Sequence, residues 1–211
     1  MSLESLLEKV PLVAILRGLQ PERAIEVGNA LFDAGIRAIE VPFNSPQPLE
    51  SIRLLSDKFR DTCLCGSGTV LTIEQVQQTH DAGGRLIVSP NSDPDVIRAA
   101  VKLGMVDFPG IATATEAFSA IKAGARHLKL FPGATYGARH LKALNDVLPK
   151  HVRVYPVGGV GADDIAEWLQ AGAAGFGFGS ELFRPTYSTQ EISQRARRVV
   201  ERYNAAAGRN A

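Results

Sequence analysis

The chain alternates short apolar runs with segments in which apolar residues recur at helical spacing. The apolar runs are nearly continuous, as is typical of parallel strands that are buried on both faces. Between them the spacing of Ala24, Val27 and Leu31 is an example of helical periodicity. Eight runs are therefore expected to be strands, at residues 11–18, 38–44, 63–70, 85–91, 105–110, 127–133, 153–159 and 175–180.

Glycines mark the expected ends of several helices, a few residues before the next strand: Gly35, Gly83, Gly104, Gly124 and Gly172. Glycine is favoured just past a helix because that position often needs a left-handed backbone. Thr72, followed by Glu74 in the first turn, is expected to cap the start of a helix.

Eight strand–helix units predict a single (β/α)₈ TIM barrel that spans residues 1–211 as one domain. The alternative is a doubly wound open sheet, which commonly carries a Gly-x-Gly-x-x-Gly turn after its first strand. Here that turn reads RGLQP at residues 17–21 and lacks the glycine pattern. The sequence shows no linker or low-complexity segment that would indicate a second domain.

Composition narrows the class of partner. Of the 211 residues 45% are hydrophobic and 21% charged, and the formal net charge is +1 with no long basic run, so neither nucleic acid nor a membrane surface is the expected partner. No apolar run approaches the ~18 residues of a membrane span, and a cytoplasmic location is expected. Cys63 and Cys65 share a strand face and are expected to be buried thiols rather than a disulfide.

Polar residues gather where the predicted strands end, which is where a barrel holds its working groups. They are Arg17, Glu40, Asn44, Thr69, Asn91, Lys129, Gly158, Gly159 and Ser180. Because they come from seven of the eight strands, they are expected to converge on one mouth of the barrel.

Lys129 is flanked by Leu128, Leu130 and Phe131 in an apolar strand. Burying an ammonium is costly unless the group is paired or its pKa falls. A lysine with a lowered pKa is partly neutral and can attack a ketone to form an imine. The alternative is a structural ion pair inside the barrel.

Glu40 also lies in an apolar strand, which makes it the natural partner of Lys129. A facing carboxylate would lessen the cost of burying both charges. It could also move protons during a reaction, directly or through a water molecule. The ion pair alone, without chemistry, remains the alternative.

The last two predicted strands end in glycine-rich sequences that include Gly158, Gly159, Gly179 and Ser180. In many barrels these two loops hold a phosphate with backbone N–H groups. Arg17 could bind a carboxylate or phosphate oxygen, or could instead pair with Glu40. Thr69 could donate its hydroxyl to the same anion or act as a cap.

The four histidines, at positions 80, 127, 140 and 151, show no metal-binding spacing, and His127 at a strand start is expected to be structural. No Ser-His-Asp arrangement is visible either. Neither a metal nor any other cofactor is therefore expected.

Together the strand-end motifs resemble the 2-keto-3-deoxy-6-phosphogluconate / 6-phosphogalactonate aldolases, nearly end to end. The motifs are AILRG (14–18), IEVPFNSP (39–46), GSGTV (66–70), IVSPN (87–91), LKLFP (128–132), VGGV (157–160) and GSEL (179–182). The resemblance implies a metal-free, typically trimeric class I aldolase, a carbon–carbon lyase of carbohydrate metabolism. It implies that Lys129 forms the Schiff base and that Glu40 shuttles protons. It also implies that Arg17 and Thr69 hold the keto acid and that Gly158, Gly159, Gly179 and Ser180 hold the phosphate.

Two positions distinguish the gluconate branch of this family from the galactonate branch. The gluconate branch usually carries Arg four residues after the strand-two Glu and Thr before the Gly-Gly, where this chain has Asn44 and Val157. The run EVPFNSP is similar to the galactonate branch. The resemblance therefore favours 2-dehydro-3-deoxy-6-phosphogalactonate, cleaved to pyruvate and glyceraldehyde 3-phosphate, over its C4 epimer, the gluconate of the Entner–Doudoroff route.

Two other classes share the phosphate-binding loops or the fold: a barrel epimerase or synthase, and a barrel that binds without catalysis. Lys129 within a strand distinguishes an imine-forming aldolase from both classes, because imine chemistry needs this lysine and those classes do not.

Overall fold

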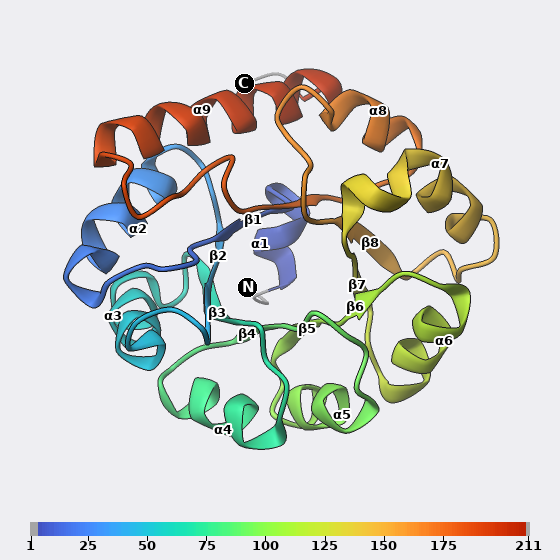
Figure 1. The fold of residues 1–211 in the computed structure, drawn as a ribbon, viewed down its shortest axis with the longest axis horizontal. Helices are drawn as coiled ribbons and strands as arrows, with labels where there is room; N and C mark the ends of the chain where they lie inside the picture. The colour runs from blue at the N-terminus through green and yellow to red at the C-terminus, as the bar shows by residue number, and fades with distance from the viewer. Residues whose placement is uncertain (1–3, 210–211) are drawn as a thin grey trace.

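The computed structural model describes residues 4–209. Its strands pair in parallel and are ringed by helices (Figure 1). They form two sheets, with strand orders β5-β4-β3-β2-β1-β9 and β6-β7-β8. Their bounds are β1 Leu12–Ile15, β2 Ala38–Pro42, β3 Leu64–Gly68, β4 Leu86–Val88, β5 Val106–Phe108, β6 Gly110–Ile111, β7 His127–Leu130, β8 Arg153–Pro156 and β9 Phe176–Phe178.

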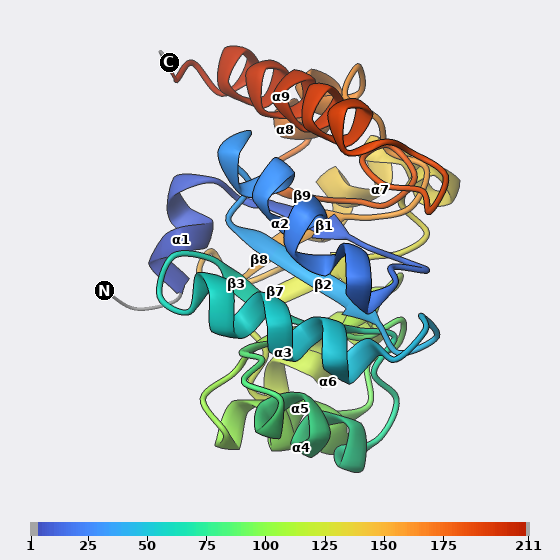
Figure 2. The same cartoon turned by 90° about the vertical axis from the view of Figure 1, so that its left-hand side faces the viewer.

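The helices form the outer layer, except for α1, whose Leu7 packs among residues inside the ring of strands. Figure 2 shows α9 running along one side of the molecule, with α4 and α5 on the opposite side. The bounds are α1 Glu4–Lys9, the 3-10 turn η1 Pro21–Arg23, α2 Ala24–Asp33, α3 Pro48–Phe59, α4 Ile73–Asp81, α5 Pro94–Lys102, α6 Ala114–Ala123, α7 Gly133–Asn145, α8 Ile165–Gln170 and α9 Thr189–Ala206.

The expected fifth strand, residues 105–110, is divided in the structure into β5 and β6. β5 pairs with β4, whereas β6 pairs with β7. Pro109 lies at the division, and a proline has no N–H to donate to a neighbouring strand. Its carbonyl oxygen still accepts a hydrogen bond from the Lys129 amide, at 2.9 Å. The expectation of eight uninterrupted strands was therefore wrong at Pro109.

Backbone contacts also link the other edges of the two sheets. The Ala174 amide donates to the Val154 carbonyl at 2.9 Å, and Val157 forms an isolated parallel bridge with Gly177. The fold is thus α/β, with a strongly curled parallel sheet whose outer face is covered by helices.

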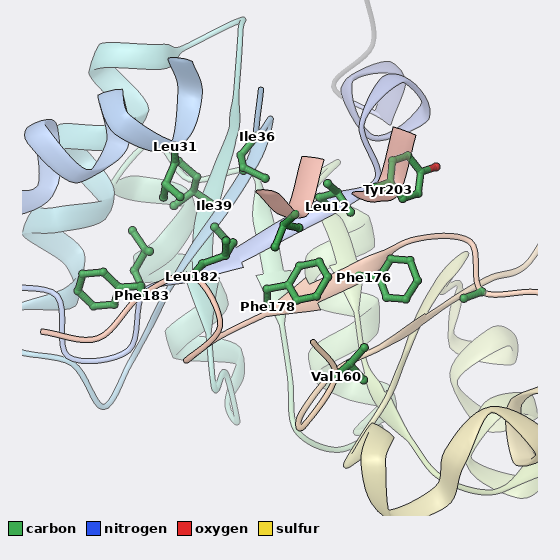
Figure 3. Packing of buried hydrophobic residues seen from close by; sticks show 14 of the residues in the cluster. Leu12, Leu31, Ile36, Ile39, Val160, Phe176, Phe178, Leu182, Phe183 and Tyr203 are labelled. Carbon is green, nitrogen blue, oxygen red and sulfur yellow. The ribbon is translucent and has the colours of Figure 1, made fainter. Parts of the chain in front are cut away.

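The largest apolar cluster lies between the strands and the helix layer. Figure 3 shows part of it, with side chains from the strands, such as Ile39 and Phe178, and from α2, such as Leu31. Side chains alternate between the faces of a strand. Leu128 and Leu130 therefore belong to this outer cluster, whereas Lys129 between them faces the inside of the curl.

Local predictions from the sequence are confirmed at the helix ends. The five expected helix-ending glycines have positive φ angles of 104°, 85°, 68°, 114° and 90° at Gly35, Gly83, Gly104, Gly124 and Gly172. The Thr72 side chain accepts a hydrogen bond from the Gln75 amide and so caps α4 as expected. Cys63 and Cys65 are buried free thiols, also as expected.

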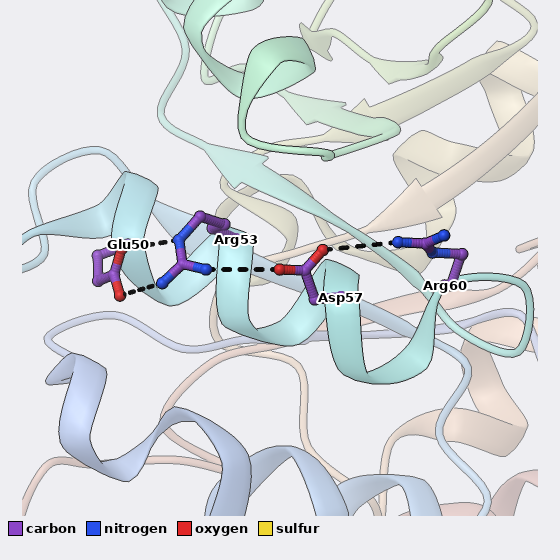
Figure 4. Close-up of polar contacts among 4 residues, drawn as sticks. All are labelled: Glu50, Arg53, Asp57 and Arg60. Carbon is purple, nitrogen blue, oxygen red and sulfur yellow. Dashed lines mark hydrogen bonds and ion pairs between the residues drawn. The ribbon is translucent and has the colours of Figure 1, made fainter.

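The outer surface of α3 carries a row of ion pairs one helical turn apart (Figure 4). Arg53 contacts Glu50 at 2.6 Å and Asp57 at 3.5 Å, and Arg60 reaches Asp57 at 3.8 Å. Because these side chains are exposed, solvent screening leaves them a small contribution to stability. No helix within residues 4–209 is long and apolar enough to cross a membrane.

Candidate active site

A cavity of about 630 Å³ opens where the strands end, and the structure brings every predicted site residue to it. Its wall includes all eight residues for which a catalytic or binding role is expected from the sequence: Arg17, Glu40, Thr69, Lys129, Gly158, Gly159, Gly179 and Ser180. Each lies within β1, β2, β3, β7, β8 or β9 or at most three residues after the end of one of these strands. The convergence expected from strand ends is therefore confirmed, except for Asn44 and Asn91, which do not line the cavity.

Lys129 is 7% exposed although it carries an ionisable amine. Its Nζ lies over the ring of Phe131, 4.7 Å from the ring centroid. No hydrogen bond or contact ion pair joins it to Glu40 in the described part of the chain. The charges of the two groups still interact across the cavity, since each shifts the pKa of the other.

Burial is the main influence on the Lys129 amine. It lowers the pKa of Lys129 because the charged form loses its hydration. The Glu40 carboxylate opposes this shift and the Arg17 guanidinium adds to it. A larger fraction of the amine is therefore neutral at neutral pH than for a lysine in water, as a nucleophile requires.

Glu40 is 2% exposed, and burial raises its pKa from 4.5 to about 7. Lys129 and then Arg17 oppose the rise, since both cations favour the charged carboxylate. A carboxyl group with a pKa near the working pH can both accept and donate a proton. The site thus pairs an amine of lowered pKa with a carboxyl of raised pKa.

Arg17 bonds to Asn44 and not to Glu40, the partner considered as the alternative to substrate binding. Its guanidinium donates to the side-chain oxygen of Asn44, which lies just after β2. Asn44 is not among the residues that line the cavity, so its contact with the site runs through Arg17. Asn91, grouped with the mouth residues in the sequence, does not line the cavity either, although Pro90 does.

Thr69 has a left-handed backbone, with φ of 56°. This conformation is uncommon for a non-glycine residue and unfavourable for a β-branched one. The strained residue comes directly after β3 and lines the cavity. Such strain persists where the surrounding structure imposes it, and it clusters at functional sites.

The glycine-rich loops leave backbone accessible beside the cavity. Gly158 and Gly159 have φ angles of 91° and 72°, which side chains tolerate poorly. A methyl group on Gly179 would meet no atom within 4 Å, so open space rather than packing surrounds this glycine. Ser180 adds a hydroxyl group to the same wall. These groups can bind an anion without a basic side chain.

Two carboxylates of this wall were not singled out in the sequence. Asp164 and Glu181 both line the cavity, and Asp164 accepts a hydrogen bond from the Gly161 amide at 2.8 Å. Glu181 is adjacent to Ser180 in the chain, and that adjacency was the available signal. No group of three or more His, Cys, Asp or Glu side chains within residues 4–209 is placed to hold a metal ion.

The fold and site define a class: an α/β protein with a curled parallel sheet whose strand ends surround a buried lysine and a buried carboxyl group. Comparison with known proteins then gives the family. A family model described as "Aldolase: KDPG and KHG aldolase" matches residues 3–198, so the chain belongs to the KDPG and KHG aldolase family. It is therefore an aldolase, a carbon–carbon lyase of carbohydrate metabolism.

Individual relatives agree. The chain is 47% identical to the 2-dehydro-3-deoxy-6-phosphogalactonate aldolase of Escherichia coli K12, over 94% of this chain and 97% of that one. It matches the solved "Native KDPGal structure" with a TM-score of 0.93 and 46% identity, over 95% and 97% of the two chains. A KDPG aldolase from Legionella pneumophila, solved with pyruvate captured as a covalent carbinolamine, matches with a TM-score of 0.81 and 28% identity, over 98% of each chain.

Proposed function

We propose that the chain is a class I aldolase that cleaves 2-dehydro-3-deoxy-6-phosphogalactonate to pyruvate and glyceraldehyde 3-phosphate. The observation that carries this proposal is the buried amine of Lys129, which lacks a contact ion pair and shares a cavity with Glu40. Imine chemistry requires such a lysine, whereas the reactions of an epimerase or a synthase do not. The carbinolamine captured in the Legionella relative supports covalent chemistry in the family.

The reaction begins when the neutral amine of Lys129 attacks the C2 ketone of the substrate. The resulting carbinolamine loses water with proton transfer by Glu40 and becomes an iminium ion. Glu40, through a water molecule, then takes the proton of the C4 hydroxyl. The C3–C4 bond breaks, its electrons enter the iminium to form an enamine, and glyceraldehyde 3-phosphate leaves.

The second half of the reaction regenerates the lysine. The enamine gains a proton at C3 and becomes the imine of pyruvate, which water hydrolyses. The pKa of Glu40, about 7, suits both directions of proton transfer at neutral pH. The iminium is the electron sink, so the mechanism needs no metal.

Recognition of the substrate divides between the two ends of the cavity. Arg17 and Thr69 hold the keto acid at one end, and Gly158, Gly159, Gly179 and Ser180 hold the phosphate at the other. Support comes from the position of all these residues on the cavity wall and from the open space above Gly179. Val157, where the gluconate branch usually has Thr, also lines the wall and is proposed to bear on C4 stereochemistry.

We further propose that the two sheets form one (β/α)₈ barrel domain, with β5 and β6 as one interrupted strand. The range expected for this domain, residues 1–211, includes residues 1–3 and 210–211, which lie outside those that the structure describes. The backbone contacts at Pro109, Val154 and Gly177 support this closure. The protein is proposed to act in the cytoplasm as a homotrimer. Exposed apolar side chains such as Leu71 and Ile73 are available to an interface between subunits.

The substrate is tested by steady-state cleavage of the two C4 epimers, with pyruvate release coupled to lactate dehydrogenase. We expect kcat/KM to be higher for the galactonate than for the gluconate. A preference for the gluconate would reassign the branch, and no pyruvate from either epimer would reject aldol cleavage. The molar mass of the protein, measured by light scattering as it elutes from a size-exclusion column, tests the proposed trimer.

A further inference from the structure

The carboxyl group of Glu40 occupies the space where most residues at position 68 would carry a side chain. A methyl group placed on Gly68 would lie 1.4 Å from Oε2 of Glu40, 2.3 Å from Cδ and 2.7 Å from Oε1. The contact results from the strand register. Pro42 is paired with Gly68, so Glu40, two residues earlier, faces the same side of the sheet as Gly68.

The backbone does not require a glycine at position 68. Its φ angle is outside the positive range seen at Gly158 and Gly159, and the residue lies inside β3. Glycine in a strand weakens it, and often marks a place where another group approaches the backbone closely. Here the approaching group is the Glu40 carboxyl, and space rather than conformation explains the glycine.

The close approach also fixes which way the carboxyl group faces. Oε2 is buried and has no hydrogen-bond partner within residues 4–209. Because Gly68 is not among the residues that line the cavity and Glu40 is, the carboxyl group is seated between the strand and the cavity. Gly68 thereby determines how far the Glu40 carboxyl group extends into the cavity toward the amine of Lys129.

We propose that Gly68 is a positioning residue for aldol cleavage. The absence of a side chain at Gly68 leaves a space, here called the seat, and this seat holds the Glu40 carboxyl group at the position relative to Lys129 that the reaction needs. A methyl at this position would lie 1.4 Å from Oε2, so the carboxyl group would have to move outward by roughly 2 Å before ordinary van der Waals contact is restored. Displacements of ~1 Å at reacting groups can cost about 100-fold in rate. This inference rests on the proposed role of Glu40.

The kinetic test is a double-mutant cycle of Gly68→Ala and Glu40→Asp. Gly68→Ala is expected to lower kcat by about 10- to 100-fold while the yield of pyruvate imine at Lys129 is kept. Glu40→Asp, whose side chain is one methylene shorter, is expected to lower kcat when Gly68 is present. In the Gly68→Ala background it is expected to restore kcat, because the shorter side chain makes room for the methyl. Equal losses in both backgrounds, or an unchanged kcat for Gly68→Ala, would overturn the proposal.

A pH profile distinguishes a moved carboxyl group from a general loss of structure. The limb of the kcat profile governed by Glu40 is expected to shift in Gly68→Ala and to return in the double variant. Gly28→Ala is the matched control, since its methyl would also be crowded, 2.6 Å from Leu55, but on α2 away from the cavity. It is expected to lower the melting temperature and to leave the kcat profile unchanged.

A stability cycle tests the same contact without relying on catalysis. The methyl of Gly68→Ala is expected to lower the urea midpoint when Glu40 is present and to be tolerated in a Glu40→Ala background. The same loss in both backgrounds would show that Glu40 does not occupy the seat. Failure of the proposed function would appear separately, as absence of cleavage and of imine in the unsubstituted protein.

Discussion

Arg17 donates a hydrogen bond to the side-chain oxygen of Asn44, from the loop after β1 to the turn after β2. Asn44 does not line the cavity, so we expect it to affect substrate binding only through the orientation of Arg17. Asn44→Ala is expected to raise KM for the keto acid about fivefold with little change in kcat, since an exposed charge-assisted hydrogen bond contributes ~1 kcal/mol.

The control for Asn44 is a change that keeps the acceptor. Asn44→Asp is expected to raise KM less than Asn44→Ala, and Asn44→Ala is expected to have no further effect once Arg17 is replaced by Ala. An undiminished effect in the Arg17→Ala background would show that Asn44 contacts substrate itself.

Ser180 is expected to serve the phosphate end of the cavity. Ser180→Ala should raise KM for the phosphorylated substrate by about tenfold or more, because a hydrogen bond to a charged group contributes ~1.5–3 kcal/mol. The comparison is KM for the unphosphorylated analogue, which should change far less. Equal losses on both substrates would remove Ser180 from the phosphate site.

The backbone conformation of Thr69 is expected to lower the stability of the fold, while its side chain is expected to contribute to substrate binding. Its left-handed backbone, with φ of 56°, costs ~1–2 kcal/mol, whereas glycine costs ~0.5–1 kcal/mol of chain entropy. Thr69→Gly should therefore unfold in urea with equal or slightly higher stability while kcat/KM falls. A loss of several kcal/mol would show that Thr69 packs or bonds in a way that outweighs its backbone strain.

Much of the fold could be predicted from local patterns because the signals were local. Buried parallel strands need apolar runs, and helix ends need glycine with positive φ, as at Gly35 and Gly124. The polar residues of the site were found by listing the residues at the end of each strand, since parallel strand ends converge. The interruption at Pro109 had a signal as well, because proline cannot donate to a ladder.

The remaining features depend on approach between distant segments. The seat that Gly68 provides for Glu40 requires the register of β2 with β3, which sequence spacing does not give. The bond from Arg17 to Asn44 joins two loops whose side chains could have pointed elsewhere. Asp164 comes to the cavity from the loop before α8 and not from a strand end, so its position in the sequence gives no sign that it lines the cavity.

Asp107 of β5 is a buried carboxyl group, 4% exposed, outside the cavity. Burial raises its pKa from 3.8 to about 8. The Phe108 amide partly opposes the shift, although neither carboxyl oxygen has a partner with hydrogen-bond geometry in the described chain. The neutral form is favoured in the folded protein and the charged form in the unfolded protein.

Stability is therefore expected to fall as pH rises through the range set by Asp107. Below about pH 4 the carboxyl group is neutral in both states, and its contribution to stability is complete. As pH rises toward 8 the unfolded chain gains stability by ionising, so the free energy of unfolding falls. In the unsubstituted protein this fall in the free energy of unfolding is on the order of 2–4 kcal/mol between pH 4 and pH 7. Asp107→Asn should abolish this fall. Urea titrations at several pH values measure it, with the exposed Asp61→Asn as control; an unchanged slope in Asp107→Asn would contradict the burial argument.

Imine formation at Lys129 is the central claim, and borohydride trapping with pyruvate tests it most directly. Intact mass followed by peptide mapping is expected to place one reduced pyruvyl adduct on Lys129. Lys129→Ala should abolish the adduct, whereas Lys122→Ala and Lys142→Ala, on α6 and α7, should leave it. Glu40→Gln should slow turnover and still permit some imine. An adduct on Lys122 or Lys142, or an unchanged yield in Lys129→Ala, would contradict the account.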